Sequence, residues 1–167
     1  MSKVIMIVDA EQSFHERYVS MLEDTGYEII HAYTAEEALL VLEKRRPDLI
    51  ITEIVLDLMT GDTLFLHVKS MSTHENIPFI LVGSISLKPY KSLMDVDPNL
   101  VFLDKKSMTK TKLIEEIKAQ TGEKYFDNTA GPADMNDIWQ MRNILRIPGE
   151  LIRTLTSHYR LSYWNRL

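Results

Sequence analysis

The stretch PDLIITEIVLDLMTG (residues 47–61) decides the fold of this chain. Leu49, Ile50 and Ile51 form an unbroken apolar run, which is typical of a parallel strand buried on both faces. Pro47 suits the position before a strand, where no ladder N–H group is needed. Glu53 follows at the carboxyl end of this strand, where open α/β sheets usually hold ligands and chemistry. The stretch therefore predicts a central strand with a carboxylate at its functional end.

Working outward from this strand, apolar runs and helical patterns alternate along the first 121 residues. The other predicted strands cover 3–8, 27–31, 78–82 and 100–103. One predicted helix covers 13–25, and a second begins after its cap residue, Thr34. Two more cover 61–71 and 109–121, and a short or irregular helix is predicted over 85–96. Such alternation predicts an α/β fold: an open, doubly wound, five-stranded parallel sheet with helices on both faces. A closed barrel is not expected, because it needs about 250 residues.

Composition sets outer limits on what the chain can be. It has 167 residues, of which 45% are hydrophobic, so it can bury a core. It has no Cys, which excludes disulfides, zinc–thiolate sites and thiol catalysis. No apolar run approaches about 18 residues, so we predict no membrane span and expect a soluble cytoplasmic protein.

Charge divides the chain unevenly. The net charge is −5, yet residues 136–167 carry five arginines against Asp137 and Glu150, a local balance of +3 that leaves −8 on the rest. We predict a domain over 1–121, a linker over 122–135 and a helical C-terminal extension over 136–167. Two short helices cannot form a core alone, so they must pack on the body, a second copy or a partner.

Polar residues gather where the predicted parallel strands end. Asp9 and Glu11 follow the first strand and Glu53 the third, while Gly83 and Ser84 follow the fourth and Lys105 the fifth. Because the carboxyl ends of parallel strands share one edge of the sheet, we expect these residues to converge.

Four motifs in this order resemble the CheY-like receiver domain of two-component response regulators. They are IVDAE (7–11), residues 47–61, PFILV (78–82) and FLDK (102–105). The resemblance covers residue 3 to about 121. It implies a flavodoxin-like sheet with strand order 2-1-3-4-5 and a role in a bacterial two-component or phosphorelay pathway.

Compared with the family's pattern, the phosphorylation site is altered. The resemblance places Asp9 at the first of two Mg²⁺-binding acids, but the second position is Ala10. Glu53 stands at the phosphoacceptor aspartate. Gly83, next to Ser84, occupies the position after the fourth strand where the family has a hydroxyl residue that takes part in switching. Only the lysine, Lys105, and the aromatic switch position, Phe102, keep the family's residue type, and Lys106 replaces the usual proline.

These losses predict a pseudo-receiver that works without phosphorylation. Mg²⁺ needs near-octahedral oxygen ligands, and only Asp9, Glu53 and the carbonyl of Val55 remain, so we expect no cofactor and weak Mg²⁺ binding at best. Glu53 is one methylene longer than aspartate and could pair with Lys105. Three interpretations stay open: a built-in mimic of the phosphorylated state, an inert scaffold, and residual phosphorylation.

The expected mode of action is protein–protein interaction. The partner is a histidine kinase or a downstream effector, or a second copy bound through the C-terminal helices or through the face formed by residues 85–96, 100–103 and 109–121. The alternatives are a phosphorylatable single-domain phosphorelay regulator and a transcription regulator whose arginine-rich tail binds DNA, although nucleic-acid binding and membrane binding are not expected. We find no Gly-rich phosphate loop and no nucleophile–base arrangement, so no enzyme is predicted.

Several remaining residues invite a chemical role that we do not assign. Asp57 lies four residues beyond the strand-end position, too far for a displaced acceptor. Phe102 is either a rotamer switch or a core residue. His15, His31, His67 and His74 are scattered without the i, i+4 spacing of a metal pair, so we interpret them as surface or helix-packing residues.

Overall fold

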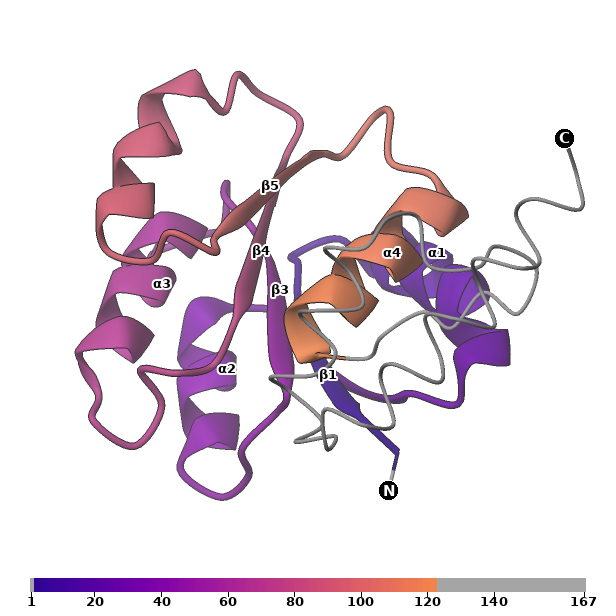
Figure 1. Ribbon diagram of the computed structural model, residues 1–167, viewed down its shortest axis with the longest axis horizontal. Coiled ribbons are helices and arrows are strands. Elements are labelled where there is room, and N and C mark those ends of the chain that lie inside the picture. The colour runs from indigo at the N-terminus through magenta and orange to yellow at the C-terminus, as the bar shows by residue number, and fades with distance from the viewer. Residues whose placement is uncertain (1, 123–167) are drawn as a thin grey trace, which may run out of the picture. The chain divides into compact units, whose positions relative to one another are not determined.

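Five parallel strands form a single sheet in the computed structural model, which describes residues 2–122 (Figure 1). The strand order is β2-β1-β3-β4-β5, so the predicted fold class and topology are confirmed. The strands are β1 (Val4–Val8), β2 (Glu28–Ala32), β3 (Leu49–Glu53), β4 (Phe79–Gly83) and β5 (Val101–Asp104).

Helices cover both faces of this sheet. They are α1 (Gln12–Leu22), α2 (Ala35–Leu42), α3 (Gly61–Ser70) and α4 (Lys110–Thr121), with 3₁₀ segments η1 (Glu23–Thr25) and η2 (Lys88–Asp95). Figure 1 shows α2 and α3 on one side of the sheet and α1 and α4 on the other. None of the helices within residues 2–122 is long and apolar enough to cross a bilayer.

Small differences separate the predicted boundaries from the observed ones. Strands β2, β4 and β5 each lie one residue later than predicted. At β4 the reason is Pro78, which has no N–H and enters the ladder only through its carbonyl, accepting a hydrogen bond from Ile50 N at 3.1 Å. The irregular helix predicted over 85–96 is the 3₁₀ segment η2, which has Pro89 near its start.

The sheet separates two apolar cores. Because side chains alternate along a strand, Met6, Val8 and Ile50 pack under α2 and α3, while Ile5, Ile7 and Ile51 pack under α1 and α4. Strands β3 and β4 are buried along their whole length. The two central strands are therefore a rigid base for the residues at their carboxyl ends.

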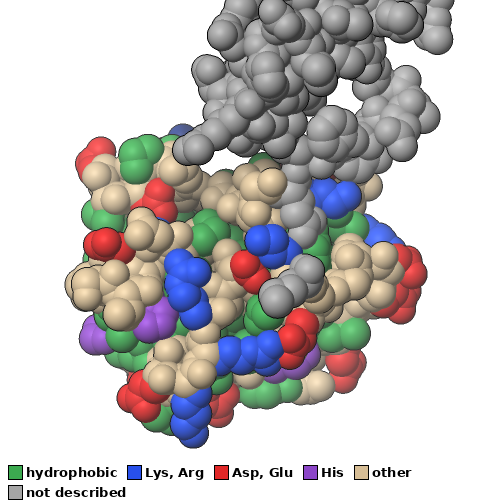
Figure 2. All heavy atoms as spheres, turned by 60° about the horizontal axis from the view of Figure 1, so that its bottom comes forward, with side chains coloured by type: hydrophobic (Ala, Val, Ile, Leu, Met, Phe, Trp, Pro, Cys, Tyr) green, Lys and Arg blue, Asp and Glu red, His purple; other side chains and the backbone are tan. Residues whose placement is uncertain are grey.

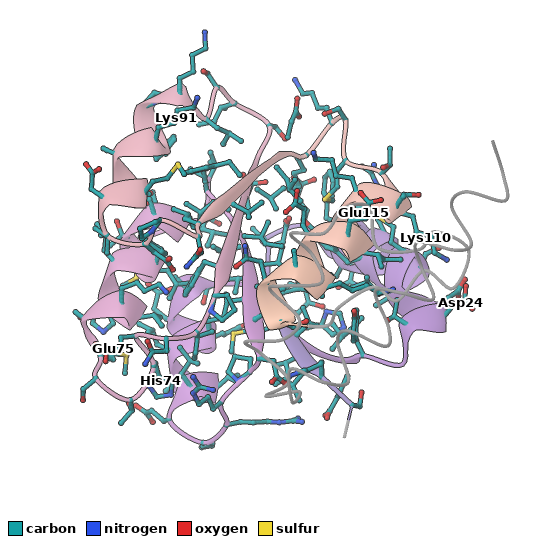
Figure 3. All side chains as sticks on the ribbon, in the orientation of Figure 1. Asp24, His74, Glu75, Lys91, Lys110 and Glu115 are labelled. Atoms are coloured by element: carbon teal, nitrogen blue, oxygen red, sulfur yellow. The ribbon has the colours of Figure 1, made fainter. Side chains whose placement is uncertain are left out.

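Polar contacts fix the connecting segments. Asp48 Oδ2 accepts a hydrogen bond from Val4 N at 2.8 Å, which joins the start of β1 to the segment before β3. The predicted helix cap is present, since Thr34 Oγ1 accepts from Glu37 N at 3.1 Å. Lys110 of α4 points toward Asp24 of η1 in Figure 3, with Nζ and Oδ2 3.0 Å apart. The predicted linker 122–135 and extension 136–167 lie outside the described residues, apart from Gly122.

Candidate functional site

The candidate site lies at the carboxyl edge of the sheet, where β1, β3, β4 and β5 end side by side. Glu53 is the last residue of β3 and pairs with Val82 of β4, and Gly83 pairs with Asp104 of β5. Asp9 follows β1 and Lys105 follows β5. The register of the sheet thus places these chain-distant residues next to one another.

Lys105 is the centre of the site. Its side chain is 2% exposed, and Nζ lies 2.8 Å from Asp9 Oδ2 and 2.9 Å from Glu53 Oε2. The exposed Glu11 adds a weaker contact, with Oε1 3.4 Å from Nζ. The ring of Phe14, on α1, lies with its centroid 3.6 Å from Nζ, close enough for a cation–π interaction. Three carboxylates and one aromatic ring therefore surround the ammonium group.

Both buried carboxylates are also held by the backbone. Asp9 Oδ1 accepts a hydrogen bond from Glu11 N at 2.9 Å. Glu53 Oε1 accepts from Ile54 N at 3.0 Å and from Val55 N at 3.2 Å. Each carboxylate therefore has one oxygen hydrogen-bonded to the backbone and the other in an ion pair with Lys105.

The electrostatics follow from this enclosure. Burial lowers the pKa of Lys105, but the Asp9 and Glu53 carboxylates outweigh burial, so the pKa is raised above its ordinary value of about 10.5. The ammonium group thus stabilises the fold below that ordinary pKa, and this contribution is lost only as the pH rises through the raised value. Burial first, and then the same two carboxylates, raise the pKa of the nearby Tyr18 phenol.

Two glycines lie next to Glu53. A Cβ on Gly61 would stand 2.0 Å from the backbone oxygen of Glu53, so only glycine allows this approach. A Cβ on Gly83 would stand 2.9 Å from Leu87 Cδ2 and 3.8 Å from Glu53 Oε1. Leu87 thus fills much of the space beside Gly83, where the family's pattern has a hydroxyl residue.

Two predicted site residues, Ser84 and Phe102, lie apart from this cluster, as does Asp57, to which the sequence assigned no role. Ser84 and Asp57 are exposed, and no contact joins either side chain to the cluster among the contacts of residues 2–122. Phe102 is half-buried and packs against the core under α2 and α3. The structure therefore brings together Asp9, Glu11, Glu53 and Lys105, but not Ser84, Asp57 or Phe102.

The donor set does not fit a divalent metal. Lys105 Nζ lies where Asp9 and Glu53 would both face a cation, and Glu53 Oε1 is already committed to two N–H groups. Ala10 offers no carboxylate. No group of three or more His, Asp or Glu side chains within the described part of the chain could hold a metal ion.

Three features were not predicted from the sequence. Phe14 covers Lys105, and the predicted surface or helix-packing residues His15 and His31 contact each other. Leu58 is 95% exposed and has a φ of 63°, a left-handed conformation that is unfavourable for leucine. Only a glycine or asparagine at position 58 would have signalled that turn.

The model of the response regulator receiver domain matches residues 5–118 of the 167. The chain belongs to this family. Its place is therefore in two-component signalling, as a receiver domain.

The receiver is similar to curated proteins of very different length. It is 27% identical over 123 residues to the polar-differentiation response regulator DivK of Brucella anthropi, covering 74% of this chain and 99% of DivK. It is 33% identical over 86 residues to adventurous-gliding motility protein Z of Myxococcus xanthus, covering 52% of this chain but only 6% of that protein.

A solved structure supports the same fold. The chemotaxis response regulator CheY4 of Vibrio cholerae superposes with a TM-score of 0.65 at 23% identity, covering 72% of this chain and 99% of CheY4. At this identity the likeness shows the fold of the receiver alone.

The first prediction concerns the buried cluster. Glu53→Ala leaves Lys105 with one buried carboxylate partner instead of two, so we expect the free energy of unfolding to fall by about 3 kcal/mol. Urea denaturation measures this change. Glu115→Ala, on the exposed face of α4 (Figure 3), is the matched control and should change the same free energy by less than about 0.5 kcal/mol. An unchanged stability for Glu53→Ala would contradict a stabilising role of the ion pair.

The second prediction compares the two glycines. Gly61→Ala forces a methyl group against a backbone oxygen, so we expect a loss of about 3 kcal/mol, because the strand end must move. Gly83→Ala meets only the flexible tip of Leu87 and should cost about 1 kcal/mol. Denaturation curves of both variants give the comparison, and equal losses would mean that Gly61 has no special role in placing Glu53.

Proposed function

We propose that this receiver signals without phosphorylation, in the cytoplasm, by binding other proteins. The observation that carries this proposal is the closed cluster of Asp9, Glu53 and Lys105, in which each charge already has its partner within the chain. Transfer of a phosphoryl group requires a free carboxylate oxygen as nucleophile, together with cations that stabilise the transferred group.

Each of these requirements is poorly met. Both oxygens of Glu53 have partners, one on the backbone and one on Lys105. Ala10 removes a ligand for Mg²⁺, which needs near-octahedral coordination and would bind weakly at best. Gly83 supplies no hydroxyl group for a phosphoryl oxygen, and the space beside it is partly filled by Leu87.

A permanent charge pair also gives the receiver a fixed signalling state. Glu53 holds Lys105 from the end of β3, and Lys105 N donates to Gly83 O at 3.0 Å, which links β5 to β4. A carboxylate that cannot change its charge by phosphorylation cannot move these strand ends. This supports either a built-in mimic of the phosphorylated state or a constant scaffold.

The binding surface that we propose is the face of η2, β5 and α4. Met94 and Val96, in and just after η2, are 41% and 52% exposed. A second apolar region is the loop after β3, where Val55 is 58% and Leu58 is 95% exposed. Exposed apolar side chains that lie together mark protein–protein contacts. We propose that these bind a histidine kinase, a downstream effector or a second copy.

Binding of nucleic acid has less support from the described surface. Figure 2 shows one face of the molecule, on which described Lys and Arg side chains are interspersed with Asp and Glu. A nucleic-acid site needs basic side chains gathered on one face. The predicted arginine-rich extension lies outside the described residues.

The competing function, a phosphorylatable phosphorelay regulator, is favoured by one observation: Asp9, Glu11 and Glu53 still gather three carboxylates around one point. We predict that the full chain with Mg²⁺ shows no saturable binding of beryllofluoride by fluorescence or NMR. Ala10→Asp combined with Glu53→Asp restores the family's acids and serves as the positive control. Saturable binding by the unaltered chain would establish the competing function instead.

A further prediction tests whether Leu58 is kept for the fold or for contacts. Leu58→Gly relieves the left-handed conformation and removes little buried surface, so the free energy of unfolding should rise by about 0.5–1 kcal/mol. Val55→Gly, in the same loop but without positive φ, should lower it. A loss of stability in Leu58→Gly would show that the leucine supports the fold, which removes it from the proposed contact surface.

A further inference from the structure

A second buried lysine lies at the opposite, amino edge of the sheet, away from the acidic cluster. Lys69 is near the end of α3, its side chain is 9% exposed, and its Nζ lies 2.6 Å from Asp97 Oδ2. Nζ also donates to the backbone oxygens of Glu75 at 2.9 Å and Ile77 at 2.8 Å, in the turn between α3 and β4 (Figure 3). Each of the three N–H groups of the ammonium therefore has an acceptor.

Asp97 connects this lysine to the proposed binding face. It lies two residues after η2, and its N–H donates to Leu93 O at 3.1 Å, near the end of that segment. Its Oδ1 accepts from Asn99 N at 3.0 Å, and its carbonyl accepts from Leu100 N at 3.0 Å, just before β5 begins. Because Oδ2 pairs with Lys69, one residue joins the end of η2 and the start of β5 to α3.

The segment η2 is weakly packed. None of its residues is buried, and Met94 and Val96, in and just after it, are 41% and 52% exposed. It is a 3₁₀ helix, whose hydrogen bonds have poorer geometry than those of an α-helix. Segments with few buried contacts open locally at a low free-energy cost. A mostly buried ion pair at the end of such a segment is therefore a strong anchor for it.

A cleft of about 630 Å³ lies beside this ion pair. It is lined by Lys69 and Asp97, by residues of the turn before β4, and by Gln120 of α4, whose Nε2 donates to Asn99 O at 2.9 Å. Because the turn over residues 96–99 borders this open space, it can move without opening the apolar core. The Gln120 hydrogen bond is neutral and thus weaker than the charge-assisted bonds of Lys69, so Lys69 is the main restraint on the turn.

We propose that Lys69 is a latch: its pair with Asp97 holds the end of η2 beside α3 and so positions Met94 and Val96 for a protein partner. The role of Met94 and Val96 as partner contacts rests on the proposed function, whereas the latch rests on the contacts of Lys69 alone. The latch uses no group of the cluster around Lys105. It therefore positions this part of the binding face in a receiver whose phosphorylation site is altered.

Hydrogen–deuterium exchange of the full chain, measured by mass spectrometry, tests the latch without any partner. Lys69→Met keeps an unbranched apolar side chain beside Phe65 and Phe79, whose ring centroids lie 5.8 Å from Nζ, and removes the ammonium group. We expect amide exchange over residues 88–100 to become faster by about tenfold or more, while β1 and β3 stay unchanged. Unchanged exchange over residues 88–100 would overturn the proposal. An equal acceleration in every strand and helix would also overturn it, because the pair would then support the whole fold.

Further variants separate the ion pair from a simple loss of packing. Asp97→Asn keeps the size of the side chain and removes its charge, so it should also speed exchange over residues 88–100. Because both side chains act through one contact, the double variant should exchange no faster there than Lys69→Met. Effects that multiply in the double variant would show that the two residues act separately, which contradicts a latch.

The matched control is Lys110→Met, which removes an ion pair with Asp24 whose side chains are 46% and 78% exposed. It should leave exchange over residues 88–100 unchanged, and an acceleration equal to that of Lys69→Met would overturn the proposal. Because these measurements contain no partner and no beryllofluoride, their failure would leave the proposed function standing, and a failure of the proposed function would leave the latch standing.

Discussion

The carboxyl edge of this receiver depends on one buried ammonium group, Lys105 Nζ. A lysine charge that is removed from water is strongly unfavourable unless close opposite charges replace its hydration. Asp9 and Glu53 do so from the ends of β1 and β3, and Lys105 itself follows β5. Because any separation would leave a buried charge without a partner, these ion pairs hold the ends of three strands together.

The longer side chain of Glu53 is accommodated by its local structure. Its Oε1 turns back to the N–H groups of the next two residues, so the extra methylene bends within the strand end and the carboxylate stays beside Lys105. Gly61 allows the close approach of its backbone to the backbone oxygen of Glu53. The backbone hydrogen bonds of Oε1 are therefore what allows a glutamate to pair with Lys105 here.

The sequence predicted features that follow from periodicity and chain order. Apolar runs such as 49–51 identified the strands, and the rule that parallel strands end at one edge brought Glu53 and Lys105 together. Strand starts were less predictable, because side-chain hydrophobicity does not show where the ladder hydrogen bonds begin. Pro78 illustrates this, since it lies beside the strand but cannot donate to it.

Contacts that depend on the rotation of a helix could not be predicted. His15 and His31 are sixteen residues apart and belong to different elements, so no sequence spacing indicates that their rings meet. Phe14 reaches Lys105 for the same reason: α1 has to turn a particular side toward the strand ends. Leu58 is a different case, because a residue that disfavours positive φ gives no sign of a left-handed turn.

Asp9 connects the start of α1 to the ends of the strands. Its three polar groups serve two segments: at α1 the carbonyl accepts from His15 and Oδ1 accepts from Glu11 N, while Oδ2 pairs with Lys105 after β5. A shift of α1 changes the first two contacts while the third resists, since breaking it exposes a buried charge. Asp9 is therefore the residue through which the position of α1 and the buried charge of Lys105 are connected.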